Sequence, residues 1–240
     1  MNSQEDIKNL LLKVAQQAGD MMSESFGLLQ ANEINYKKPD KKSPVTDVDI
    51  NIDTMIREAV FQTFPDHDII SEEKESINNA GDVIWIIDPI DGTRNYINGI
   101  KEHCVSVGIA KGGEIILGAI YAPQLNEFFV AERGNGVLLN GEPLKKQTPN
   151  ERLCYVDNKR LTTKSVKSVF KGCKETHNGS AALELAYVAQ GKAEGSLLEH
   201  IMIWDIAAGM LMVEEMGGRL TTFDGSPYTF ESSTLIAYSR

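Results

Sequence analysis

The sequence predicts a layered α/β fold. Three observations carry this prediction: apolar residues at helical spacing near the start, an apolar run of strand length that ends abruptly in acidic residues, and helices alternating with strands toward the end. The chain has 240 residues, 42% of them hydrophobic and 24% charged, which is ordinary for a globular protein. A chain of this length buries about 70–75% of its unfolded surface, so it needs no disulfide or metal to fold.

Two helices are expected in the first quarter of the chain. Apolar residues recur at helical spacing over residues 7–22, and this stripe predicts an amphipathic helix with a core-facing side. Thr46 and Asp49 match the pattern of a capping box, so a second helix is expected to begin there and to run through Val60. Phe64-Pro65 is a stop signal for that helix.

Strands dominate the middle of the chain. We expect a short strand over residues 68–70 and a strand buried on both faces over residues 83–87, where the sequence is continuously apolar. Pro89 removes a backbone donor, so we expect this second strand to stop at Asp88. Residues 105–139 then show a β-rich pattern interrupted by glycine turns.

The last third alternates between helix and strand patterns. Helices are expected over residues 180–189 and 204–216, the second ending at Gly217. Strands are expected over residues 195–198 and 235–238.

Charge and cysteine content exclude several classes of protein. The formal net charge of −10 argues against binding a nucleic acid polymer, although a small phosphorylated ligand can bind if carboxylates first take up cations. The three cysteines lack disulfide-framework and zinc-site spacing. The polar, acidic N-terminus is no signal peptide, and no apolar run approaches the ~20 residues of a membrane helix. We therefore expect a cytoplasmic protein with no membrane partner.

The most informative local pattern is Asp88-Pro89-Ile90-Asp91-Gly92-Thr93 at the end of the buried strand. A turn of this length can bring the carboxylates of Asp88 and Asp91 to the same side. Gly92 permits unusual backbone angles and leaves room for a ligand to approach. If Thr93 begins a short helix, the amides around it point at an anion. Taken alone, Asp-Gly after a strand is more often an ordinary turn.

Other acidic residues recur at strand ends and helix starts. Glu72 and Glu73 follow a predicted strand, whereas Asp49 and Asp205 lie at the starts of helices. Each has an ordinary alternative: solvated charge for the glutamates, an N-terminal cap for Asp205 and a capping box for Asp49. Together, however, clustered carboxylates without paired His or Cys suit hard cations such as Mg²⁺. Loops at these places are where α/β folds bind ligands.

These motifs resemble the inositol monophosphatase family, a lithium-sensitive, Mg²⁺-dependent group of sugar phosphatases. The likeness rests on residues 88–93, on Glu72-Glu73 upstream and on residues 204–209 downstream, and it covers nearly the whole chain. It implies an αβαβα sandwich over residues 1–240, with an N-terminal half to about residue 145, a C-terminal half from about 146, and assembly as a homodimer.

The resemblance also implies a role for each motif residue. The metal ligands would be the side chains of Glu72, Asp88, Asp91 and Asp205 and the carbonyl of Ile90, holding two or three Mg²⁺ ions. Catalysis would fall to Glu72, Thr93 and Asp49, the last two positioning and deprotonating the attacking water, while Glu73 would support the site without touching an ion. The residues that would contact the substrate are Asp91, Gly92, Thr93, Gly179, Ser180, Ala181, Glu199 and Asp205.

Ordinary chemistry agrees with that assignment. Metal-activated water needs no protein nucleophile, and no Ser–His–Asp or Cys–His arrangement competes in the sequence. Two departures from the family pattern are Ser71, in place of the glycine common before the glutamates, and Tyr96, in place of the usual phenylalanine. Glu199 also lies one residue closer to Asp205 than in animal members, which puts its role in question.

Several functions remain open from the sequence. The leading hypothesis is hydrolysis of inositol monophosphate or a similar sugar or polyol phosphate. The alternatives are a phosphatase acting on 3′-phosphoadenosine 5′-phosphate, fructose 1,6-bisphosphate or histidinol phosphate, and, from another class, a non-catalytic protein that binds divalent cations or sugar phosphates. Asn95-Tyr96 favours the inositol branch, whereas Ser71-Glu72-Glu73 slightly resembles the nucleotidase branch.

Overall fold

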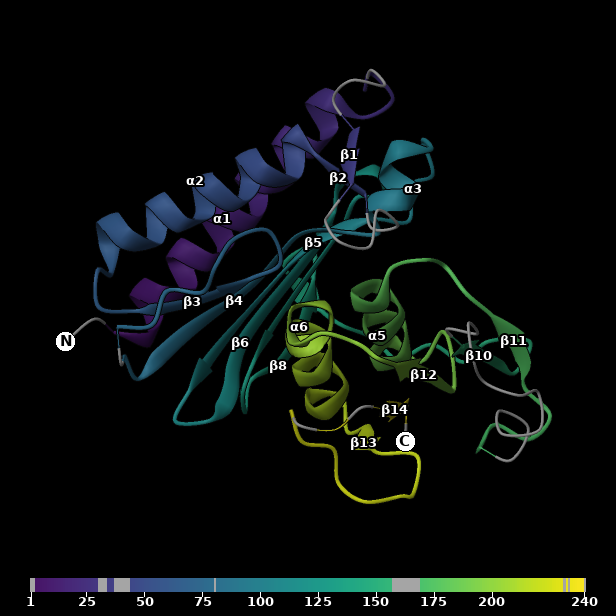
Figure 1. The fold of residues 1–240 in the computed structure, drawn as a ribbon. Helices are drawn as coiled ribbons and strands as arrows, with labels where there is room; N and C mark the ends of the chain where they lie inside the picture. Colours follow the sequence, from purple (N-terminus) through teal and green to yellow (C-terminus); the bar gives the residue numbers. More distant parts are fainter. Residues whose placement is uncertain are drawn as a thin grey trace.

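Helices and sheets alternate in layers (Figure 1). The computed structural model describes residues 3–29, 34–36, 44–79, 81–156, 169–230, 232 and 234–239. Helices α1 (Gln4–Ser25) and α2 (Asp47–Thr63) lie on one face of a seven-stranded sheet. Helices α5 (Ala181–Gln190) and α6 (Ile203–Glu215) lie between this sheet and a five-stranded one.

The first sheet has the order β3-β4-β5-β6-β7-β8-β9 and pairs antiparallel except between β3 and β4. Its strands are β3 (Asp68–Ser71), β4 (Val83–Asp91), β5 (Cys104–Lys111), β6 (Glu114–Ala122), β7 (Glu127–Glu132), β8 (Gly136–Leu139) and β9 (Glu142–Pro143). Because β3 and β4 run parallel, their C-terminal ends meet at one edge, where Ser71 pairs with Ile87.

The second sheet has the order β11-β10-β12-β14-β13, with β10 parallel to both of its neighbours and the rest antiparallel. Its strands are β10 (Leu153–Val156), β11 (Lys174–Thr176), β12 (Gly195–Glu199), β13 (Arg219–Thr221) and β14 (Thr234–Tyr238). A separate two-stranded ribbon joins β1 (Ile34–Tyr36) to β2 (Pro44–Thr46).

Two large apolar cores separate these layers. The first packs the apolar stripe of α1 and the inner side of α2 against β4, β5 and β6. The second lies around α5 and α6, which are apolar nearly all round because sheets cover both of their sides. A smaller cluster that includes Phe170, Cys154 and Ile236 lies apart from both. The predicted layered α/β architecture is confirmed.

Two local predictions need correction. Strand β4 does not stop at Asp88 but continues to Asp91, with a break in its register against β5 between these two residues. Proline is tolerated there because the irregularity removes the need for its missing donor. Asp205 is not the cap of α6: Met202 takes that position, and Asp205 Oδ2 accepts a hydrogen bond from the Met202 amide at 3.1 Å.

Other local predictions are confirmed. The capping box of α2 forms between Thr46 and Asp49, and Ser180 caps α5 by accepting from the Leu183 amide. Thr93 begins the short helix α3 (Thr93–Ile97). Within the described ranges, no helix combines the length and apolar character that a bilayer crossing demands.

Candidate active site

Three carboxylates from two distant segments meet beside one cavity. Asp88 and Asp91 come from the end of β4, and Asp205 comes from the first turn of α6. One carboxylate oxygen of each lies within 4.8 Å of the others. Asp88 is 2% exposed and Asp91 8% exposed, so water compensates little of their charge.

The electrostatics of this cluster favour a bound cation. Burial, followed by the negative charges of Glu72, Asp91 and Asp205, raises the pKa of Asp88 well above its usual range. Burial and then the charge of Asp205 raise the pKa of Asp91 to about 8, against the opposing hydrogen bonds from Ser180 and Ala182. Without a compensating cation, like charges this close take up protons. An all-oxygen, strongly acidic donor set therefore fits a hard divalent ion.

The backbone around Gly92 holds these carboxylates in place. Gly92 has φ of 90° and ψ of 35°, a left-handed conformation that glycine adopts without strain. A Cβ here would also approach the carbonyl oxygen of Glu102 to 3.0 Å. Asp88 Oδ1 accepts from the Ile90 amide at 3.1 Å, which orients that carboxylate within the turn.

Asp91 connects β4 to the start of α5. Its Oδ2 accepts from the hydroxyl of Ser180 at 2.6 Å and from the amide of Ala182 at 2.7 Å. Ser180, which the resemblance assigned to the substrate, is fully buried and directed at this carboxylate. Gly179 and Ala181 on either side of it do line the cavity.

Thr93 and Asp49, which are expected to position and deprotonate the attacking water, have their side chains in contact. Thr93 Oγ1 lies 3.5 Å from Asp49 Oδ1 and 3.0 Å from the carbonyl oxygen of Ile90. Asp49 is fully buried, and its Oδ2 accepts from the Thr46 amide at 2.8 Å. The carboxylate is therefore oriented by its own helix cap, with its other oxygen toward Thr93.

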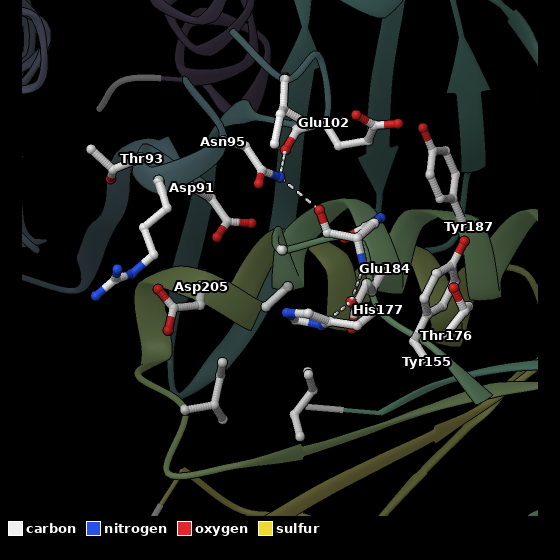
Figure 2. A pocket seen from close by; sticks show the side chains of 18 of the residues that line it. Asp91, Thr93, Asn95, Glu102, Tyr155, Thr176, His177, Glu184, Tyr187 and Asp205 are labelled. Carbon is white, nitrogen blue, oxygen red and sulfur yellow. Dashed lines mark hydrogen bonds and ion pairs between the residues drawn. The ribbon is translucent and has the colours of Figure 1, made fainter. Parts of the chain in front are cut away.

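The cavity has a volume of about 1360 Å³, and side chains from several elements line it (Figure 2). Seven of the residues predicted for the site line it: Glu72, Asp91, Gly92, Thr93, Gly179, Ala181 and Asp205. Asp49, Asp88, Ile90, Glu73, Ser180 and Glu199 are not among the lining residues.

Sequence reasoning missed part of this lining. Asn95, Glu102, Tyr155, Glu184 and Tyr187 all line the cavity, and Figure 2 shows Tyr155 and Tyr187 on the side away from Asp205. The sequence offered one usable signal: Glu184 is the single charged residue of α5, whose other residues are nearly all apolar. A lone carboxylate on a buried helix indicates a polar partner.

That partner is the loop before α5. Glu184 is fully buried, and its Oε1 lies 3.0 Å from His177 Nδ1 and accepts from the Asn178 amide at 3.1 Å. Its Oε2 accepts from the Ser196 hydroxyl at 3.2 Å. Glu184 thus holds the segment that leads into Gly179, while His177 lies at the cavity with half of its side chain exposed.

Asn95 connects α3 to the loop before α5 across the cavity. Its Nδ2 donates to the carbonyl oxygen of Glu102 at 2.5 Å and to that of Asn178 at 2.6 Å, as Figure 2 shows. Gly179 has φ of 84°, and a Cβ on it would come within 2.8 Å of the Asn95 side chain. Glycine is therefore required here for this close approach.

Architecture and site together define a class of protein: an α/β sandwich with a carboxylate site suited to divalent cations, built from the end of β4 and the first turn of α6. Comparison with known proteins identifies the family. The model of the inositol monophosphatase family matches residues 3–240. The chain belongs to this family, whose members are metal-dependent phosphatases that hydrolyse phosphomonoesters.

Individual relatives are similar over nearly the whole chain. A fructose-1,6-bisphosphatase/inositol-1-monophosphatase of Thermotoga maritima is 36% identical over 94% of this chain and 88% of its own length. The Nus factor SuhB of Escherichia coli K12 is 31% identical over 95% of this chain and 90% of its own. Among solved structures, a Thermotoga maritima IMPase has a TM-score of 0.86 and 32% identity, covering 98% of this chain and 92% of its own.

Proposed function

We propose that this phosphatase hydrolyses inositol monophosphate or a similar sugar or polyol phosphate, with Mg²⁺ as its metal. The observation that carries the proposal is the meeting of Asp88, Asp91 and Asp205 at one edge of a cavity large enough for a sugar. Two or three ions would be held by these side chains, by Glu72 and by the Ile90 carbonyl. Bound there, divalent ions supply charge neutralisation and lower the pKa of a coordinated water.

The chain's own residues complete the reaction. Thr93 orients the attacking water with its hydroxyl oxygen, and Asp49 accepts the proton that Thr93 passes on; the 3.5 Å contact between them supports this role. The amides of Gly92 and Thr93 face the phosphate oxygens. Glu73 supports the site from the loop that carries Glu72.

The far side of the cavity suits a neutral alcohol. Glu102 contributes a carboxylate there, and Tyr155 and Tyr187 contribute aromatic rings. Carboxylates accept hydrogen bonds from hydroxyl groups and repel a second phosphate. This chemistry supports a polyol over a bisphosphate. Gly179 and Ala181 lie at the same place and are proposed to contact the alcohol, whereas Ser180 is proposed to act through Asp91.

The second candidate substrate is fructose 1,6-bisphosphate. Relatives from Thermotoga maritima and Aquifex aeolicus, 36% and 33% identical, both carry fructose-1,6-bisphosphatase in their names. Inhibition by lithium, assembly as a homodimer and a cytoplasmic location, which the family resemblance implied, remain predictions.

A panel of phosphomonoesters tests the function. With Mg²⁺ present, we expect kcat/KM to be highest for inositol 1-phosphate or another polyol monophosphate, and lower for fructose 1,6-bisphosphate, 3′-phosphoadenosine 5′-phosphate and histidinol phosphate. Asp88→Asn should abolish most turnover because it removes a buried metal ligand. A preference for a bisphosphate would overturn the substrate assignment.

The matched control is Asp82→Asn, which makes the same substitution at the surface. The Asp82 side chain is 70% exposed, and its Oδ2 lies 4.0 Å from Lys111 Nζ. This variant should turn over like the wild type. If the wild type hydrolyses no phosphomonoester with Mg²⁺, a non-catalytic binding protein becomes the better account.

A further inference from the structure

An ionic cluster centred on a buried carboxylate lies behind the segment that carries Glu72. Asp53 in α2 is fully buried, and Arg57, one turn later, pairs with it at 2.9 Å. Ser71, the last residue of β3, donates its hydroxyl to Asp53 Oδ1, and Lys74 Nζ lies 3.6 Å from Asp53 Oδ2. We call Asp53, Arg57, Ser71 and Lys74 the Asp53 cluster.

The Asp53 cluster fixes the backbone on both sides of Glu72. Ser71 precedes Glu72 directly, and its hydroxyl also lies 3.5 Å from the Glu73 amide. On the far side, Arg57 Nη2 donates to the carbonyl oxygen of Lys74 at 3.1 Å. The Glu72 amide donates to the carbonyl oxygen of Ile87, in the middle of β4, at 3.2 Å. The segment is therefore fastened to α2 and to β4, and the Glu72 side chain lines the cavity.

The same helix positions the expected proton acceptor. Asp49 and Asp53 are four residues apart in α2, so their side chains lie on the same face, one turn apart. Asp49 reaches Thr93, and Asp53 reaches Ser71. One rigid helix thereby sets the relative placement of Thr93, which begins α3, and Glu72, which follows β3.

A buried ion pair of this kind is weak evidence for stability. Desolvation of the charges offsets much of their attraction, so apolar replacements are often equally stable. The hydroxyl of Ser71 adds a directed contact to the carboxylate. Such contacts, one step removed from a metal, orient the groups that bind it.

We propose that Ser71 and Asp53 are positioning residues that hold Glu72 in the orientation needed to bind a divalent cation. This inference rests on the proposed function, because Glu72 is assigned as a ligand there. It also gives a role to Ser71, which stands where the family resemblance led us to expect glycine.

Calorimetric titration of the purified full chain with Mg²⁺, without substrate, tests the proposal. Ser71→Ala removes only the hydroxyl and leaves the Asp53–Arg57 pair intact. We expect it to weaken Mg²⁺ binding by about 10–100-fold, the usual effect of removing a group behind a metal ligand. The apparent KM for Mg²⁺ should rise by the same factor, while kcat at saturating Mg²⁺ stays near the wild-type value. Ser71→Thr keeps the hydroxyl and should restore the affinity.

Thr63→Ala is the matched control. Thr63 lies in α2, as Asp53 does, and its hydroxyl donates to the carbonyl oxygen of Ala59 at 2.9 Å, away from the Asp53 cluster. It should bind Mg²⁺ like the wild type. Wild-type affinity in Ser71→Ala overturns the proposal, and so does a lowered Tm with unchanged affinity, since that would mean a purely structural role. If the wild type itself binds no Mg²⁺, the proposed function fails together with this inference.

Discussion

The proposed role of the Thr93 hydroxyl in orienting the attacking water can be tested directly. Its hydroxyl lies between the Ile90 carbonyl, at 3.0 Å, and Asp49, at 3.5 Å. The hydroxyl has a single proton, which can turn toward either acceptor. A water held near Thr93 can therefore donate to its oxygen while the threonine proton turns toward Asp49.

Thr93→Ala should lower kcat by at least the ~10–100-fold typical of groups that tune a metal site. Thr93→Ser keeps the hydroxyl and should retain most of the activity. Steady-state kinetics at saturating Mg²⁺ measure both variants. Turnover at the wild-type rate in Thr93→Ala would remove this residue from the mechanism.

At the scale of elements, the approach of α6 to the first sheet decides where Asp205 lies. Gly108 in β5 faces Ala207 in α6, and a Cβ on Gly108 would lie 2.8 Å from the Ala207 Cβ. Gly118 in β6 makes a similar approach to the backbone of Ala208, at 2.9 Å. These two strand glycines therefore let α6 pack closely against the first sheet at Ala207 and Ala208, just after Asp205.

Gly108→Ala should destabilise the fold by about 1–3 kcal/mol, as overpacking of a core usually does. Ala207→Gly alone should cost about 1 kcal/mol, because glycine weakens a helix. The double variant should be less destabilised than the sum, since it removes the clashing methyl group; we expect a coupling of about 1 kcal/mol. Urea unfolding measures all three variants, and strict additivity would contradict the packing described.

At the scale of the molecule, α5 and α6 join the two sheets into one body. The second apolar core contains Ile120 and Phe129 of the first sheet together with Leu198 and Leu235 of the second. Asn95 adds a hydrogen bond to Asn178 across 83 residues of sequence. We propose that residues 1–145 and 146–240 are halves of a single folding unit.

The two tryptophans test this proposal, because Trp85 lies in β4 and Trp204 in α6. In single-tryptophan variants made with Trp204→Phe or Trp85→Phe, we expect each fluorescence transition in urea to coincide with that variant's own far-ultraviolet circular dichroism transition. Coincidence of different probes is the mark of a cooperative transition. Separated midpoints within one variant would show that the halves unfold independently.

Local patterns in the amino-acid sequence predicted most of the longer helices and strands and the carboxylates proposed to bind the cation. Helices α1, α2, α5 and α6 followed from apolar spacing and capping residues, because these are local properties of the chain. The carboxylates Asp88, Asp91 and Asp205 stood out because they follow a buried strand or begin a helix. Local rules failed at Pro89, where the strand continues through an irregularity that only its neighbour β5 defines.

The surroundings of those carboxylates follow from how distant segments pack and from no local pattern. Ser180 lies 89 residues from Asp91, and Ser71 lies 18 from Asp53, so no local pattern indicates either contact. The same holds for Asn95 with Asn178 and for the place of Glu184 behind His177. Such pairs depend on how the layers stack, because a hydrogen bond forms only when packing has already brought both groups within about 3 Å.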